Sequence, residues 1–154
     1  MARISQRAMN NVVIVAMLLM IALFNIDSFL PKQDIAQYQS LLPQDVYVLK
    51  IEHDENSLER SGQIWRQRTG DTALSVPPDR QFSAWQQAML EPISGVPQTV
   101  SSMQPLVVVV WVAGQANGLV YGFYPSTSPT VVKYDGNWYT LTNAELDTLL
   151  PWKH

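Results

Sequence analysis

The chain has 154 residues, a formal net charge of −3 and no cysteine. Without cysteine the protein has no disulfide, no thiolate zinc site and no cysteine nucleophile. Eight basic and twelve acidic residues follow position 31, a net charge of −4 there, so we expect neither nucleic acid nor an anionic lipid surface as a partner. The 123 residues after that position are enough for one domain with its own core.

The longest apolar run, residues 8–26, has no charged side chain. As a helix, its 19 residues extend about 28 Å, close to the thickness of the hydrocarbon core of a bilayer. We therefore predict a single transmembrane anchor over residues 8–30. Asn25 is the candidate membrane contact, because headgroups and water can satisfy an amide near the end of a span.

Two arginines, Arg3 and Arg7, precede the span. They favour a cytoplasmic N-terminus over residues 1–7 and an extracytoplasmic domain. The absence of cysteine fits a cytosolic domain or a bacterial envelope domain, and the absence of Asn-x-Ser/Thr sequons favours a bacterial source. With the domain outside the cytoplasm, we expect a Gram-negative inner-membrane protein with a periplasmic domain. A cleaved signal peptide is the alternative reading, and residues 23–31 lack an obvious small-x-small cleavage site.

Residues 31–44 are predicted to form a connector helix. Ile35, Tyr38 and Leu42 recur there at helical spacing, ahead of Pro43. Such a helix would hold the domain close to the membrane or dock on a partner.

The domain proper, residues 45–154, begins with apolar and polar side chains that alternate over residues 45–52. This alternation predicts a strand. A second strand over residues 61–68 is expected to pair with the first one across a loop at residues 54–60.

A helix is predicted from Asp79, as its N-cap, to a stop at Pro92. Its apolar stripe of Phe82, Trp85 and Met89 should pack onto the sheet. The next dozen residues contain serine, glycine and proline without a period, and we predict a surface loop there.

Residues 106–113, LVVVVWVA, are β-branched and aromatic, and we predict a central strand that is buried on both faces. Residues 114–118 supply a turn, after which residues 119–124 return antiparallel to the first strand. Gly122 in the middle of the returning strand indicates a bulge or the close approach of a large neighbour.

The dipeptide Asp135-Gly136 lies between strand-forming residues and specifies a two-residue type I′ hairpin. The turn fixes the register of the opposing pairs. These pairs are Tyr134–Asn137, Lys133–Trp138 and Val132–Tyr139.

The chain closes with a predicted helix that ends at Pro151 and begins with a capping box of Thr142 and Glu145. Its buried side consists of Leu146, Leu149 and Leu150. The fold class is therefore α+β, with a mostly antiparallel sheet of about six strands and helices packed on one face.

His53 lies in the run Glu52-His53-Asp54-Glu55. A histidine among carboxylates suits acid–base chemistry, so an envelope hydrolase that uses His53 with Glu52 or Asp54 is one hypothesis. A solvated turn has the same sequence, and no serine of the domain stands in a G-x-S-x-G or S-x-x-K setting. We predict no catalytic site, no metal site and no cofactor.

The candidate interaction surface consists of Lys133 and Trp138 on the predicted hairpin and of Arg66 and Arg68 on the second strand. Exposed tryptophans and paired arginines mark binding surfaces, although the same residues also serve as core or as solvated ion pairs. The leading hypothesis is a membrane-anchored accessory or assembly subunit that binds other membrane or periplasmic proteins. The alternative is a module that binds a glycan or an anionic metabolite through Trp138, Tyr139, Arg66 and Arg68.

Overall fold

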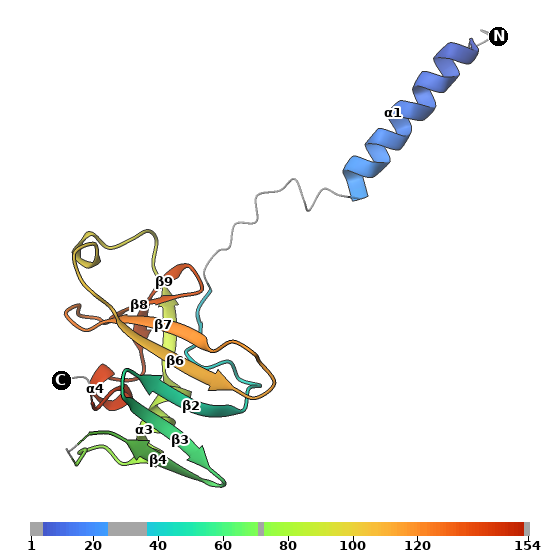
Figure 1. The fold of residues 1–154 in the computed structure, drawn as a ribbon. Helices are drawn as coiled ribbons and strands as arrows, with labels where there is room; N and C mark the ends of the chain where they lie inside the picture. The colour runs from blue at the N-terminus through green and yellow to red at the C-terminus, as the bar shows by residue number, and fades with distance from the viewer. Residues whose placement is uncertain (1–4, 25–36, 71–72, 153–154) are drawn as a thin grey trace. The chain divides into compact units, whose positions relative to one another are not determined.

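The computed structural model of the chain describes residues 5–24, 37–70 and 73–152 (Figure 1). It comprises two compact units, Met1–Ile35 and Ala36–His154. We describe each unit separately.

The first unit contains α1 (Gln6–Phe24), a helix of 19 residues with no buried side chain. The hydroxyl of Ser5 caps its start and accepts a hydrogen bond from the backbone N–H of Ala8 at 3.2 Å. An apolar helix of this length near the N-terminus is consistent with a membrane anchor or a signal sequence. The candidate membrane contact, Asn25, lies outside the described residues.

The second unit is built on one antiparallel sheet of nine strands, in the order β1-β5-β9-β8-β7-β6-β2-β3-β4. In chain order the strands are β1 (Gln39–Ser40), β2 (Val48–His53), β3 (Asn56–Ser61), β4 (Ile64–Arg68), β5 (Met89–Pro92), β6 (Leu106–Val112), β7 (Leu119–Tyr124), β8 (Val131–Tyr134) and β9 (Asn137–Thr142). The described helices of this unit are α3 (Pro78–Gln87) and α4 (Leu146–Leu149), and a 3-10 turn, η1 (Gln98–Val100), lies between β5 and β6. The α+β class is confirmed, but the sheet is larger than predicted.

Three strands were missed, because tertiary pairing outweighs local propensity in each of them. Residues of β3 were expected in a loop, yet its one apolar residue, Leu58, is fully buried opposite Ile51 of β2. β5 replaces the last turn of the predicted helix: α3 ends at Gln87, and the chain up to Pro92 pairs with β9. β1 lies within the predicted connector helix, whose described part, residues 37–44, is not helical.

The inner face of the sheet carries the main hydrophobic core and is covered by α3 and α4. Trp85 of α3 meets Phe123 of β7 edge-on, with ring centroids 5.8 Å apart. The carbonyl of Leu149 in α4 accepts hydrogen bonds from the side chains of Gln81 and Trp85 at 2.9 and 3.0 Å. These bonds tie the two helices together over the core.

The segment after β1 also belongs to this core. Leu41 and Leu42 are 1% and 6% exposed. The carbonyl of Leu41 accepts a hydrogen bond from the hydroxyl of Tyr121 at 2.7 Å, and its N–H donates to Ala88 at 2.9 Å. These long-range bonds explain why the described part of the expected connector is joined to the domain in an extended form.

Both predicted helix starts are corrected by the structure. α3 begins after Pro77, without a side-chain cap, and Asp79 lies in its first turn. α4 begins after Glu145, again without a side-chain cap. Thr142 instead ends β9, where its hydroxyl lies 3.4 Å from the carbonyl of Met89, so no capping box forms. The three leucines expected on the buried side of this helix are at most 6% exposed.

Two of the three predicted hairpins are confirmed. The third is wrong: β2 does not pair with β4, because β3 lies between them and pairs with both. β6 pairs antiparallel with β7, and β8 and β9 have the predicted register. Asp135 and Gly136 have φ values of 47° and 76°, as a type I′ turn requires. A Cβ on Gly122 would lie 3.3 Å from the Cβ of Pro105, so the predicted close approach comes from the residue before β6.

β6 is buried on one face only, which corrects the sequence prediction. Val108 and Val110 are fully buried, whereas Val107 is 48% exposed. A continuous apolar run is typical of parallel strands covered on both sides, but an antiparallel sheet can leave one face to solvent.

Candidate interaction surface

The face of the sheet opposite α3 and α4, which we call the outer face, is covered only in part. Near β7, β8 and β9, the loop between β5 and β6 packs over it in a small cluster of Val100, Tyr124 and Val131. The strand register places a second set of residues on the uncovered part of this face. They are Lys50, Glu52, Glu59, Ile64, Arg66, Arg68, Val107, Val109, Trp111 and Val120.

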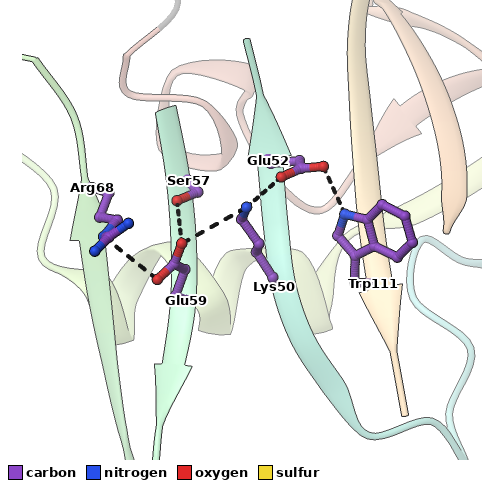
Figure 2. Close-up of polar contacts among 6 residues, drawn as sticks. All are labelled: Lys50, Glu52, Ser57, Glu59, Arg68 and Trp111. Atoms are coloured by element: carbon purple, nitrogen blue, oxygen red, sulfur yellow. Dashed lines mark hydrogen bonds and ion pairs between the residues drawn. The ribbon is translucent and has the colours of Figure 1, made fainter. Parts of the chain in front are cut away.

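A row of alternating charges crosses three strands of the outer face, β4, β3 and β2, and ends at Trp111 of β6 (Figure 2). The Glu59 carboxylate lies 3.7 Å from Arg68 and 3.8 Å from Lys50, which also pairs closely with Glu52. At the end of the row, the indole N–H of Trp111 donates a hydrogen bond to Glu52 at 2.7 Å. Exposed ion pairs contribute at most about 1 kcal/mol each, so the row mainly orders the side chains of this surface.

The two oxygens of the Glu52 carboxylate are both engaged in this row. One accepts the indole hydrogen bond of Trp111 and the other faces Lys50. The hydrogen bond with Lys50, followed by that with Trp111, lowers the pKa of Glu52 below its ordinary value. Glu52 is therefore ionised at neutral pH and its charge is balanced within the protein.

Next to the charged row lies an apolar surface made of Val107, Val109, Trp111 and Val120, which we call the valine–tryptophan patch. Val107, Trp111 and Val120 are 48%, 36% and 55% exposed. Val109 stands directly opposite Val120 in the register, so the patch continues from β6 to β7. Contiguous exposed apolar side chains mark interaction sites, and tryptophan is enriched among residues that dominate binding energy.

This patch was not predicted from the sequence. The run LVVVVWVA has no alternation, so it does not reveal which residues face solvent. The antiparallel hairpin predicted for the same residues could have indicated an exposed face, because antiparallel sheets commonly have one solvated face.

The predicted pair of Lys133 and Trp138 forms on the outer face of β8 and β9. The ammonium of Lys133 lies 5.3 Å from the centre of the Trp138 ring. Trp138 is half-buried, because its ring also packs against Tyr124 at 5.5 Å in the cluster under the loop. The aromatic hairpin is therefore only partly available to a partner.

The predicted arginines, Arg66 and Arg68, lie on the same face but at the far edge of the sheet. Four strands separate β4 from β8. At a spacing of about 4.8 Å between strands, the arginines stand roughly 24 Å from Lys133. Tyr139, which the ligand-binding hypothesis also used, is 3% exposed on the inner face. The structure thus does not bring these residues together into one ligand site.

His53 lies at the end of β2 and is 8% exposed. Its Nδ1 donates a hydrogen bond to the carbonyl of Val107 at 2.7 Å, and its Nε2 lies 3.4 Å from the carboxylate of Asp54. Glu52 points to the opposite face, because successive side chains alternate along a strand. The structure therefore pairs His53 with Asp54 and with the β6 backbone, and not with Glu52.

In the described ranges, no three His, Asp or Glu side chains converge as a metal site. Two pockets of about 200 and 320 Å³ lie beside α3. Neither pocket is lined by Trp138, Arg66 or Arg68, and the larger one includes Arg80.

Comparisons of the chain with family models, with curated proteins and with solved structures find no match.

Proposed function

We propose that the protein is a single-pass, membrane-anchored accessory or assembly subunit of a bacterial envelope complex. α1 supplies the anchor, and the domain binds other membrane or periplasmic proteins through its outer face. The two arginines before the span orient the chain, so that residues 1–7 are cytoplasmic and the domain is periplasmic in a Gram-negative cell.

The observation that carries this proposal is the valine–tryptophan patch. Val107, Trp111 and Val120 are exposed on regular strands, next to charges that already balance one another. A partner that covers the patch buries apolar area without isolating an unpaired charge. The fixed strand geometry also lowers the entropy lost on binding, because few side chains have to be ordered.

Purification of the full-length protein from its own membranes in a mild detergent, followed by mass spectrometry, tests the proposal. We expect a stoichiometric membrane or periplasmic partner. Val107→Thr together with Val120→Thr keeps the shape and β propensity of both residues but removes two apolar methyl groups. A buried carbon contributes about 0.8 kcal/mol, so recovery of the partner should fall roughly tenfold.

The matched control is Val96→Thr, at a valine that is 55% exposed outside the patch. This variant should recover as much partner as the wild type. A protein that is always purified alone would contradict the subunit proposal. Equal recovery with the double variant would show that the patch is not the docking surface.

A further inference from the structure

We infer that the free edge of β4 binds an extended, acidic segment of a partner protein, which adds a further strand to the sheet. This inference rests on the proposed function, because it names the chemistry of one partner segment. It concerns an edge that is separated from the valine–tryptophan patch by β3 and β2.

The two edges of the sheet differ in what they offer to a partner. β1 forms one edge and has two residues, whereas β4 forms the other and has five. A very short edge strand offers few backbone groups, while a longer one can pair with an added strand. In the part of the chain that the structure describes, the backbone of β4 pairs with β3 alone.

The register identifies the backbone groups at the free edge. Ser61 and Ile64 close a two-residue turn, in which Gly62 has a φ of 65°. In such a hairpin the closing pair shares both hydrogen bonds, and bonded and non-bonded pairs alternate from there. The N–H and C=O groups of Trp65 and Gln67 therefore point away from β3.

The edge strand is held in place from the inner face. The Trp65 ring stacks on Phe82 of α3, with centroids 4.0 Å apart. The Gln67 amide donates hydrogen bonds to the carbonyl of Val76 at 2.8 Å and to Gln81 at 2.7 Å. Because β4 is already ordered by these contacts, pairing with an added strand costs little conformational entropy of β4 itself.

The charge of this edge is opposite to that of the domain. Three of the eight basic residues beyond position 31, Arg60, Arg66 and Arg68, lie in the β3–β4 hairpin, and β4 has no acidic residue. The Arg68 side chain is 76% exposed and meets Glu59 at 3.7 Å, while Arg66 is exposed and makes no ion pair among the described residues. Carboxylates at alternate positions of an added strand would lie beside both arginines.

The same charges argue against a second copy of this chain as the occupant. Pairing of β4 with β4 would place the Arg66 and Arg68 side chains of both copies on one face, next to each other. Like charges on neighbouring strands destabilise the pairing. An acidic strand from a different protein has the charge that complements the arginines of this edge.

The test uses the full-length protein in its own membranes, with the photoreactive residue benzoylphenylalanine in place of Ile64. Ile64 is 53% exposed at the start of β4. We expect a light-induced crosslink to another protein, and peptide mapping should locate it in a segment with Asp or Glu at alternate positions. Arg66→Gln together with Arg68→Gln should reduce the yield roughly tenfold, because two charge-assisted pairs are lost.

The control variant is Arg80→Gln, which removes an exposed arginine on α3 and should leave the yield unchanged. Three results would overturn the inference: a crosslink to a second copy, a partner segment without acidic residues, or a yield that the two glutamine substitutions do not change. If a partner is purified with the wild type but Ile64 forms no crosslink, the edge is not used, although the proposed function stands. If neither a partner nor a crosslink is found, both the proposed function and the inference about the β4 edge fail.

Discussion

The two faces of the nine-stranded sheet are built from the same strands but differ in chemistry. In β6, Val108 is fully buried on the inner face while its neighbour Val107 is 48% exposed on the outer face. In β7, Phe123 is fully buried while Val120 is 55% exposed. The inner face therefore carries the packing that holds the fold, and much of the outer face is exposed to solvent.

The largest effect on stability is expected when the inner face loses an aromatic ring. Phe123→Ala should lower the free energy of unfolding by about 3–5 kcal/mol, through lost burial and the cavity left behind. Urea unfolding of the full-length protein in detergent, followed by circular dichroism, measures this change. A loss below about 1 kcal/mol would show that the inner face is not the main source of stability.

Substitutions at two neighbouring valines of β6 compare directly how much each face of the sheet contributes to stability. Val108→Ala removes two methyl groups from the core and should cost about 2–3 kcal/mol. Val107→Ala removes the same groups from an exposed position and should cost less than about 1 kcal/mol. Equal losses in the same unfolding experiment would contradict the assignment of the two faces.

A buried hydroxyl links the inner face to the segment after β1. Tyr121→Phe leaves the Leu41 carbonyl without its donor and should cost about 1–3 kcal/mol at neutral pH. Burial raises the pKa of Tyr121, so its contribution is present below about pH 10 and is lost as the unfolded chain ionises above that pH.

Unfolding curves between pH 8 and 11 would test this dependence. The Phe variant should lose less stability than the wild type as the pH rises. Tyr38→Phe, at a tyrosine that is 55% exposed, serves as the control and should behave like the wild type. Identical alkaline curves for Tyr121→Phe and the wild type would contradict the account.

The smallest effect is expected in the charged row of the outer face. Glu52→Gln should change stability by less than about 1 kcal/mol at neutral pH. The pKa of Glu52 is lowered chiefly by Lys50, so its contribution is present above the usual glutamate range and is lost as the pH falls through the lowered pKa.

The variant should therefore lose less stability than the wild type on acidification, and high salt should reduce the difference because the row is partly exposed. Acid unfolding at low and high salt measures both effects. If Glu52→Gln lowered the free energy of unfolding by several kcal/mol at neutral pH, the charged row, and not the core, would be the main source of stability for β2, β3 and β4.

Much of the fold could be predicted from local sequence signals. The Asp135-Gly136 turn fixed the register of β8 and β9, and the apolar run of β6 identified a core strand. The strands that were missed have little local signal: β3 is mostly polar, and β5 ends at Pro92. Their pairing depends on partners far away in the chain, which the sequence pattern does not reveal.

The candidate site was harder to predict than the fold. Arg66, Arg68, Lys133 and Trp138 were chosen by residue type, and all four lie on one face, but at separate places in the strand order. The valine–tryptophan patch was hidden in a run that resembles buried core. Which of its valines face solvent depends on where α3 and α4 pack, and this is a property of the tertiary structure.

The most direct test of the account is hydroxyl-radical footprinting of the full-length protein, both in its own membranes and as pure protein produced in a foreign host that lacks the partner. Trp111, which is 36% exposed in the patch, should be oxidised in the purified protein and protected severalfold in the membrane by its partner. Trp85, which is fully buried on the inner face, should be protected in both samples. Equal oxidation of Trp111 in the two samples would contradict the claim that the outer face binds a partner.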